Sequence, residues 1–199
     1  MKLIMLWLSL LLVISIPVMA QDNPKLEVFG GYQYQTIGGN LGWQVGSPYN
    51  GWDTAVTFNF SKHFGATGDF SGNYHSGNFG GGSYYTHILT YAGGPVYSFG
   101  SGSNLKPFVH AMFGGAHITT PVMYGTSPTY ASEGGYTAMA GGGVDYKLKK
   151  RIAVRLAQFD WIYYHNKDLG DFIGAKSSRG DSPNFTSNVR ISTGVVFRF

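Results

Sequence analysis

The 199-residue chain contains no cysteine, so no disulfide contributes to its stability. Charged residues are scarce as well. Asp, Glu, Lys and Arg together make up 12% of the chain, about half the usual share for a soluble domain. A soluble surface depends on charge for its hydration, so this composition favours a protein that turns much of its surface toward lipid.

A hydrophobic stretch long enough to form a membrane-spanning helix is also missing. The apolar run at residues 3–16 has 14 residues, fewer than the ~20 that a spanning helix needs. Lys2 precedes this run, and Val18 and Ala20 are short side chains at the −3 and −1 positions of a cleavage site. We therefore expect a signal peptide at 1–20, cleaved after Ala20, and one outer-membrane barrel domain at 21–199. A buried N-terminal helix or a membrane anchor is the alternative.

Glycine and aromatic residues are abundant, with 30 glycines and 16% Phe, Trp and Tyr. After residue 20, no segment keeps an apolar period of 3.6 residues for more than two turns. Stretches of alternating polar and apolar residues recur instead, each followed by a break rich in Gly, Ser, Asn or Pro. The eight stretches are 25–36, 52–62, 64–75, 84–97, 105–117, 135–146, 150–164 and 186–199. This even number predicts an all-β fold, an eight-stranded antiparallel up-and-down transmembrane β-barrel.

The two faces of each predicted strand differ in a consistent way. In 52–62, Trp52, Val56 and Phe60 share one face, and Asp53 and Asn59 share the other. The apolar face begins and ends in aromatic residues with smaller residues between them, which is typical of a lipid-facing band flanked by aromatic girdles. A soluble lipocalin-like barrel, which has its apolar side inside, is the alternative.

The polar faces carry charges that would point into the lumen, where unpaired charge is very costly. The predicted lumen charge network comprises Glu27, Asp69, Asp145, Arg155, Arg190 and Arg198. One strand breaks the alternation, because Asp160 and Arg155 have opposite parity. We expect a β-bulge near 157–158 that returns Gln158 and Asp160 to the inside; a strand that ends there is the alternative. His110, in mid-strand, is expected to pack in the lumen.

The predicted connections alternate in length. They are short near 61–63, 100–104 and 148–150, and longer at 37–51, 76–83, 118–134 and 165–185. Short turns at one end and long loops at the other are typical of outer-membrane barrels, with the long loops outside the cell and both chain ends in the periplasm. We therefore expect Trp43, Tyr49, Tyr124 and Tyr130 to lie in loops.

Together these features resemble the small outer-membrane β-barrel proteins of the OmpA-like and OmpX-like kind. The resemblance rests on the signal peptide, the eight strands, the terminal Phe199 and three stretches of sequence. These stretches are "LTYAGGPVYSF" at 89–99, "KPFVHAMFGGAH" at 106–117 and "RLAQFDWIYY" at 155–164. The resemblance covers the whole of 21–199 and implies a location in the bacterial outer membrane.

The resemblance also implies an assembly signal and partners. In such proteins the last strand is recognised by the barrel assembly machinery, a role that would belong here to Val195, Phe197 and Phe199. OmpA-like proteins often add a peptidoglycan-binding domain; this sequence ends with the barrel, so we expect none. The expected partners are outer-membrane lipids, lipopolysaccharide, the assembly machinery and periplasmic chaperones. We expect a monomer that binds no nucleic acid.

The first functional hypothesis is non-enzymatic: a structural or surface-interaction role, with a lumen too narrow for large solutes. A barrel enzyme that acts on lipid or peptide is the alternative, although no spacing matches a hydrolase motif. No cofactor is expected. Four histidines near the predicted loop ends are weak candidates for a metal site, and hydrogen-bonded rim residues are the simpler interpretation. They are His75, His87, His117 and His165.

The sequence also contains a cluster of basic residues and an RGD tripeptide, and neither requires a special function. Lys147, Lys149, Lys150 and Arg151 hold much of the basic excess, and we interpret them as a solvated turn rather than a nucleic-acid patch. The tripeptide RGD at 179–181 lies in the longest predicted loop, where an adhesion motif would have to be. Three residues recur by chance in many proteins, so this motif carries little weight.

Overall fold

The computed structural model describes residues 24–37, 48–79, 82–99, 104–124, 127–165 and 185–199. The predicted signal peptide with Ala20, Trp43 and the RGD tripeptide lie outside these ranges. In the described residues, no helix is long and apolar enough to cross a membrane.

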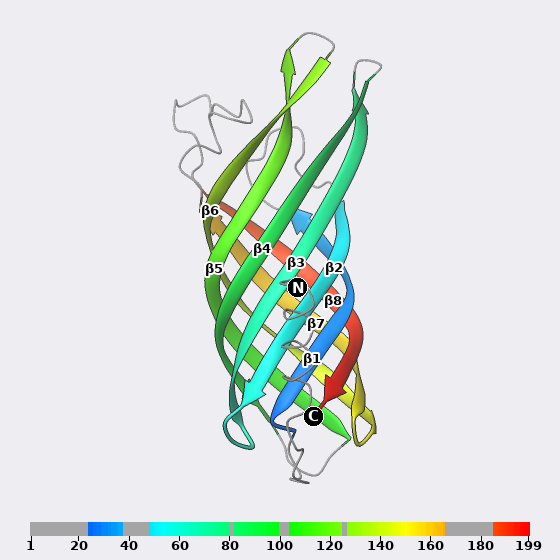
Figure 1. Ribbon diagram of the computed structural model, residues 1–199, viewed down its shortest axis with the longest axis vertical. Helices are drawn as coiled ribbons and strands as arrows, with labels where there is room; N and C mark the ends of the chain where they lie inside the picture. The colour runs from blue at the N-terminus through cyan, green and yellow to red at the C-terminus, as the bar shows by residue number, and fades with distance from the viewer. Residues whose placement is uncertain (1–23, 38–47, 80–81, 100–103, 125–126, 166–184) are drawn as a thin grey trace, which may run out of the picture.

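Eight strands make up the described part of the chain (Figure 1). They are β1 Leu26–Ile37, β2 Pro48–Asn59, β3 Phe64–Phe79, β4 Gly82–Ser98, β5 Leu105–Tyr124, β6 Ser127–Lys149, β7 Ile152–His165 and β8 Phe185–Arg198. Each strand pairs antiparallel with its neighbours in sequence, and β8 pairs with β1 to close the barrel. The predicted fold class, an eight-stranded antiparallel up-and-down barrel, is confirmed.

The two ends of the barrel differ, and we name them by their connections. The turn end carries the connections 60–63 and 150–151, together with Pro24, Phe99, Asn104 and Phe199. The loop end is the opposite one, where β1 ends and β2 begins. In Figure 1 the turn end is at the bottom, and the β3–β4 and β5–β6 hairpins rise at the top beyond the other four strands.

Two of the predicted long loops are wrong, because the strands continue through them. β3 and β4 stay paired up to Phe79 and Gly82, and β5 and β6 up to Tyr124 and Ser127. The stretches expected as loops at 76–83 and 118–134 are therefore largely strand. Their Gly, Ser and Pro residues indicated breaks, but the pairing of the two long strands continues past them.

The position of Tyr49 is also a correction. This residue was expected in a loop, but it lies on β2 with its side chain fully buried in the lumen. Tyr124 and Tyr130 lie on β5 and β6 rather than in a loop.

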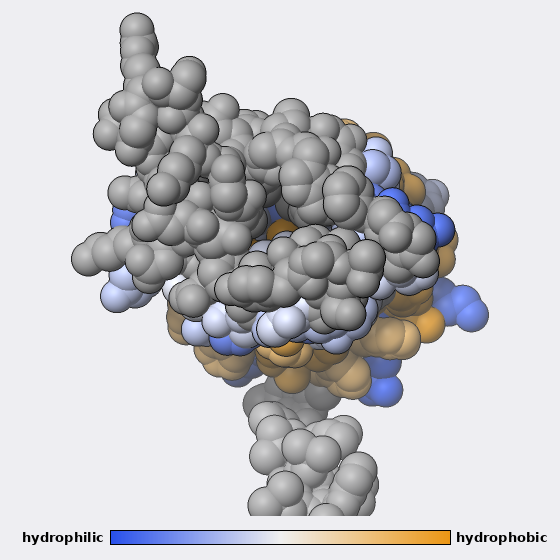
Figure 2. Space-filling model, turned by 90° about the horizontal axis from the view of Figure 1, so that it is seen from above, coloured by the Kyte–Doolittle hydropathy of each residue, from blue (hydrophilic) through white to orange (hydrophobic). Residues whose placement is uncertain are grey.

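Side chains alternate between lumen and exterior along the strands, apart from a bulge on β7. On β4, Tyr91, Gly93, Pro95 and Tyr97 point outward, and the residues between them point in. The same order of aromatic, small and aromatic residues occurs on β6 between Tyr136 and Tyr146. The outer wall is thus apolar with aromatic residues toward its ends, and Figure 2 shows hydrophobic side chains on the part of the outer wall that is visible at the lower right.

The predicted bulge on β7 is confirmed. Arg155 pairs with Gly194 of β8 and Gln158 pairs with Ser192, so two residues of β7 oppose Thr193 alone. The Thr193 hydroxyl donates a hydrogen bond of 2.9 Å to the Arg155 carbonyl. The bulge places Arg155, Gln158 and Asp160 all inside, where each is buried. The strand continues to His165, so the alternative of a strand end near 157–158 is wrong.

Apolar clusters occupy the lumen toward both ends. Toward the loop end the cluster comprises Tyr49, Ile88, Ala92, Met112, Ala116, Met139, Ile162 and Tyr164. Toward the turn end a second cluster contains Phe29, Ala55, Ala153 and Val196. The buried charges described next lie between and beside these clusters.

Candidate functional site in the barrel lumen

The first group of buried charges, the mid-barrel cluster, comprises Arg190, Asp53, Asp69, Asp160 and His110. Arg190 is on β8 and is fully buried. Its Nη1 and Nη2 donate to Oδ1 and Oδ2 of Asp69, both at 3.1 Å. Its Nε donates to Asp160 Oδ2 at 2.8 Å. One guanidinium therefore joins three strands, β3, β7 and β8, across the lumen, in the two-pronged geometry that suits arginine and carboxylate.

The remaining donors of Arg190 and its partners are also satisfied. Arg190 Nη1 donates to Ser71 Oγ at 3.0 Å. Gln158 Nε2 donates to Asp160 Oδ2 at 2.7 Å, and His110 Nε2 lies 2.8 Å from Asp160 Oδ1. Hydrogen bonds on this scale are what allow a buried ion pair to offset its desolvation cost.

Asp53 is the exception in this cluster. Its carboxylate is fully buried, yet neither oxygen accepts a hydrogen bond from the described residues. The nearest cation is Arg190, whose Nη1 lies 3.9 Å from Asp53 Oδ1. Asp53 thus lies in the cluster without the contacts that stabilise Asp69 and Asp160.

Gly141 on β6 makes room for the cluster. A Cβ at this position would clash with Asp160 Oδ1 and with the Phe159 carbonyl. Gly143 likewise lies close to the Ala157 carbonyl of β7, and Gly142 lies close to the Phe108 carbonyl of β5, so close packing against both neighbouring strands explains the glycine run at 141–143.

The second group, the turn-end cluster, comprises Glu27, Lys106, Asp145, Arg155 and Arg198. Lys106 Nζ lies 3.0 Å from Glu27 Oε1, and Arg198 Nε lies 3.3 Å from the same oxygen. Arg155 Nε donates to Asp145 Oδ1 at 2.9 Å, and Arg198 Nη2 lies 3.5 Å from Asp145 Oδ2. Each carboxylate of this cluster therefore has two cationic partners.

Arg155 and Gln158 connect the two clusters. The Arg155 guanidinium lies over the rings of Phe29 and Phe108, 4.2 and 4.4 Å from their centroids. Its Nη1 donates to Gln158 Oε1 at 2.6 Å, and Gln158 in turn donates to Asp160. A continuous hydrogen-bonded path therefore runs from Asp145 to Arg190.

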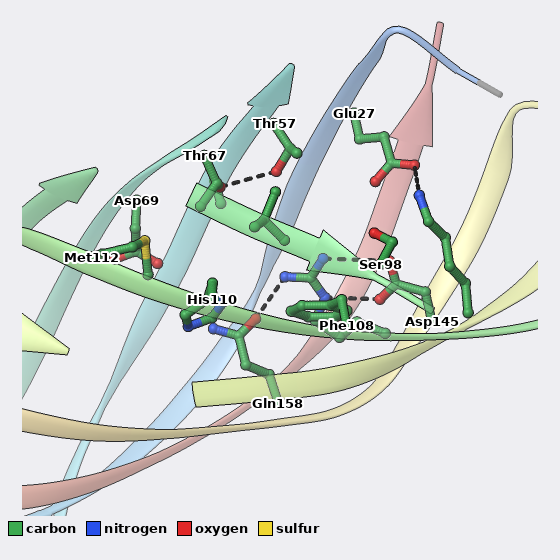
Figure 3. A pocket seen from close by; sticks show the side chains of 14 residues that line it. Glu27, Thr57, Thr67, Asp69, Ser98, Phe108, His110, Met112, Asp145 and Gln158 are labelled. Atoms are coloured by element: carbon green, nitrogen blue, oxygen red, sulfur yellow. Dashed lines mark hydrogen bonds and ion pairs between the residues drawn. The ribbon is translucent and has the colours of Figure 1, made fainter. Parts of the chain in front are cut away.

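A cavity lies beside this path in the turn-end half of the lumen (Figure 3). Side chains from both clusters line it, including Glu27, Asp69, His110 and Asp145, and so does the connecting Gln158. The lining carries both signs of charge, already paired with one another. This arrangement suits hydrogen bonding and charge pairing inside the barrel rather than a substrate of one charge.

The four candidate histidines do not converge. His75 Nδ1 lies 3.0 Å from the Pro48 carbonyl, and His117 Nε2 lies 2.6 Å from Ser132 Oγ. The His87 ring stacks on Tyr85, and His165 ends β7. Among the described residues, no three His, Cys, Asp or Glu side chains come close enough together to hold a metal ion.

The structure places all six residues of the predicted lumen charge network inside the barrel, each buried. Arg190 reaches Asp69, whereas Arg155 and Arg198 meet at Asp145. Lys106 is not one of the six predicted residues, although its parity on β5 matches that of His110. Asp53 and Asp160 were predicted on inward faces but not as members of this network, and both are fully buried partners of Arg190.

The three residues of the implied assembly signal lie on the outer face of β8. Val195, Phe197 and Phe199 are 37%, 47% and 41% exposed, so all three are accessible from the side of the barrel. Phe199 is hydrogen-bonded through its backbone to Leu26 of β1, at the seam that closes the barrel.

Comparison with known proteins gives a likeness of structure. No protein-family model matches this sequence, and neither does any curated protein. Solved structures do match. Neisserial surface protein A has a TM-score of 0.61 at 13% identity over 88% of this chain and 97% of its own.

Two more solved structures match over most of the chain at similarly low sequence identity. Ail, the attachment invasion locus protein of Yersinia pestis, in complex with the heparin analogue sucrose octasulfate, has a TM-score of 0.60 at 12% identity, over 89% of this chain and 99% of its own. The N-terminal β-barrel domain of Pseudomonas aeruginosa OprF has a TM-score of 0.51 at 14% identity, over 88% and 98%. At these identities the likeness establishes the fold, that of the small outer-membrane barrels.

Proposed function

We propose that this chain is an integral outer-membrane β-barrel with a structural or surface-interaction role and no enzymatic activity. The polarity of the wall carries the proposal: charged side chains fill the inside, and the outside is apolar with aromatic residues toward its ends. A soluble lipocalin-like barrel needs the opposite arrangement. The likeness to small outer-membrane barrels agrees with this reading.

The proposed orientation places the turn end in the periplasm and the loop end outside the cell. Short periplasmic turns and longer external connections are the rule for such barrels. The exported domain would begin after Ala20, once the proposed signal peptide is removed. Mass spectrometry of the protein extracted from outer membranes would test this, with Gln21 expected as the first residue.

Two measurements test membrane insertion. In cells we expect the protein in the outer-membrane fraction, and on detergent gels we expect its migration to change with heating. In bilayers, Val56→Arg is expected to destabilise the fold by about 2–4 kcal/mol, because Val56 is 51% exposed on the proposed lipid face. An Arg at this position that leaves stability unchanged, or a wild-type product found soluble in the periplasm, would contradict the proposal.

The lumen contents support a structural role rather than transport of large solutes. The loop-end apolar cluster and the mid-barrel cluster fill successive levels of a barrel whose width is just enough for side chains. Reconstituted protein is therefore expected to give at most a small conductance in planar bilayers. Large, stable channels would contradict this part of the proposal.

The two long hairpins support a surface-interaction role. Tyr85 of β4 and Tyr130 of β6 stack with their ring centroids 4.1 Å apart, which ties the β3–β4 hairpin to the β5–β6 hairpin beyond the ends of β2 and β7. A rigid aromatic platform of this kind suits contact with lipopolysaccharide or another surface. Tyr85→Ala should loosen it without affecting insertion, which hydrogen exchange of the two hairpins would report.

The proposed assembly signal makes a separate prediction. Removal of Phe199 is expected to impair insertion in cells, where the assembly machinery and periplasmic chaperones act, more than refolding of the purified protein into detergent. Equal yields of inserted protein in cells for the wild type and the truncated chain would contradict this role for Val195, Phe197 and Phe199.

A further inference from the structure

The exposed cationic side chains of the described chain all gather at the turn end. Ten Lys and Arg residues lie in the described ranges, and four of them, Lys106, Arg155, Arg190 and Arg198, point into the lumen. The remaining six are exposed and form what we call the basic rim. The basic rim comprises Lys25, Lys62, Lys147, Lys149, Lys150 and Arg151.

No exposed Asp or Glu side chain opposes the basic rim in the described part of the turn end. The acidic residues nearest to it are Glu27 and Asp145, which are buried and already paired with Lys106, Arg155 and Arg198. At the loop end the described residues include no Lys or Arg at all. Among the described residues, exposed positive charge is therefore confined to the turn end.

The basic rim is continuous across the seam of the barrel. The Arg198 amide donates to the Arg151 carbonyl at 2.9 Å, and the Phe199 amide donates to Leu26 at 2.8 Å. The Asn59 amide then donates to the Lys25 carbonyl at 2.8 Å. These contacts join the β6–β7 turn, the C-terminal strand, the start of β1 and the end of β2, so the basic residues of these elements follow one arc of the perimeter.

Apolar side chains interleave with this arc and fix its height relative to a bilayer. Leu148 is 56% exposed between Lys147 and Lys149, and Phe60 and Phe64 are 67% and 60% exposed on either side of Lys62. Exposed aromatic and aliphatic residues of this kind lie at the edge of the hydrocarbon. A lysine one or two positions away reaches the level of the lipid headgroups, with its carbon stem along the apolar surface.

From this arrangement we infer that the basic rim binds the anionic headgroups of phospholipids in the leaflet at the turn end. The inference rests on the proposed function, since it requires an inserted barrel. The negative charge of a phosphate diester complements the positive charge of the basic rim. The exposed apolar side chains beside the rim fit the acyl chains of the same lipid molecule. An acidic soluble protein would match the charge but would leave Leu148, Phe60 and Phe64 without a partner. An anionic phospholipid therefore fits both the cationic side chains and the apolar side chains of this surface.

The test compares lipids bound to the inserted protein. The full exported chain is reconstituted into equimolar phosphatidylglycerol and phosphatidylcholine, and spin-labelled analogues of the two lipids report their relative association with the barrel. We expect phosphatidylglycerol to be preferred by about five-fold for each cation that touches a headgroup, which corresponds to about 1 kcal/mol per Lys or Arg. The preference should fall when salt is raised from 0.1 to 1 M, since the Debye length drops from about 10 to about 3 Å.

Two matched variants separate charge from shape. Lys62→Gln, Lys149→Gln, Lys150→Gln and Arg151→Gln combined should remove most of the preference. The charge-retaining set, with Arg at the three lysine positions and Arg151→Lys, should keep it. A preference that survives in the glutamine variant would overturn the inference, because the anionic lipid would then be held elsewhere.

The outcomes also distinguish this inference from the proposed function. Failure of the wild-type chain to insert, seen as migration that does not change with heating, would overturn the proposed function and the inference with it. An inserted wild type that associates equally with both lipids would overturn the inference alone. So would an inserted protein that shows no lipid preference but binds soluble polyglutamate through the rim, since the partner would then be an acidic peptide.

Discussion

The two charge clusters of the lumen distribute their partners in opposite ways. In the mid-barrel cluster a single guanidinium, Arg190, serves three carboxylates, and the Arg190, Asp53, Asp69 and Asp160 side chains are at most 1% exposed. In the turn-end cluster three cations share Glu27 and Asp145, and exposure reaches 17% at Lys106. One cluster therefore depends on one residue, whereas the other is redundant.

This difference determines how strongly the stability of the barrel depends on single residues of the lumen. Burial strengthens each ion pair but makes an unpaired charge expensive, so a cluster with one hub is rigid and easily broken. Shared partners near the barrel mouth tolerate the loss of one member. Mutations in the two clusters should therefore have effects of different size although the residue types are the same.

The largest effect is expected for Arg190→Met. The change leaves Asp53, Asp69 and Asp160 buried without their cation, which should lower the free energy of unfolding by about 3–5 kcal/mol. Urea titration of the protein folded in bilayers measures it. Since the loss comes from buried carboxylates that no longer have a cationic partner, adding Asp69→Asn and Asp160→Asn to the same chain should recover part of the stability.

Arg198→Met is the matched control for Arg190→Met. Arg198 bridges Glu27 and Asp145, and both keep a cationic partner after its removal. The same chemical change should therefore cost about 1.5–2 kcal/mol, in the range of a hydrogen bond to a charged group. Equal losses for the two variants would mean that the clusters do not differ as described.

A second pair of variants compares two carboxylates within the mid-barrel cluster. Asp69→Asn replaces one of the two oxygens that accept from Arg190 with an amide nitrogen, which cannot accept, and should cost about 2 kcal/mol. Asp53→Asn replaces a carboxyl group that accepts no hydrogen bond from the described residues, so stability should change by less than about 0.5 kcal/mol or rise. The same urea titration decides between them, and a larger loss for Asp53→Asn would refute this assignment.

A smaller effect is expected for Lys106→Met in the turn-end cluster. Lys106 is 17% exposed on its side chain, and Glu27 retains Arg198 at 3.3 Å. The loss should be about 1 kcal/mol and should shrink in high salt, which screens the wild-type pair. A loss as large as that of Arg190→Met would show that the turn-end cluster is not redundant.

The sequence predicted the parts of this fold that follow from alternation. Strand number, the faces of β1, β2, β3 and β6, and the inward direction of Arg155, Arg190 and Arg198 all follow from a two-residue period. Which carboxylate each arginine reaches does not, because it depends on strands far apart in the sequence, as with Arg190 and Asp69. Tyr49 and the long hairpins were missed because Gly, Ser and Pro residues there suggested loops, whereas pairing with a neighbouring strand extended the sheet.

The bulge on β7 allows one strand to contribute inward side chains to both charge clusters. Removing it is expected to change stability less than any other variant described above. Arg155 belongs to one cluster and Asp160 to the other, and their spacing has the wrong parity for one face unless an extra residue intervenes. On β8, Arg190 and Arg198 have equal parity and need no such residue.

Deletion of Ala157 should therefore leave a regular strand that still directs Arg155, Gln158 and Asp160 inward. With Ala157 removed, Leu156 would face Thr193 on β8, and Gln158 would keep its pairing with Ser192. Stability should change by no more than about 0.5 kcal/mol in urea titration. The matched deletion of Ala140 on β6 lacks a bulge to absorb it, so it should reverse the faces of half the strand and prevent folding. If both deletions prevented folding, the extra residue would have a role in β7 beyond parity.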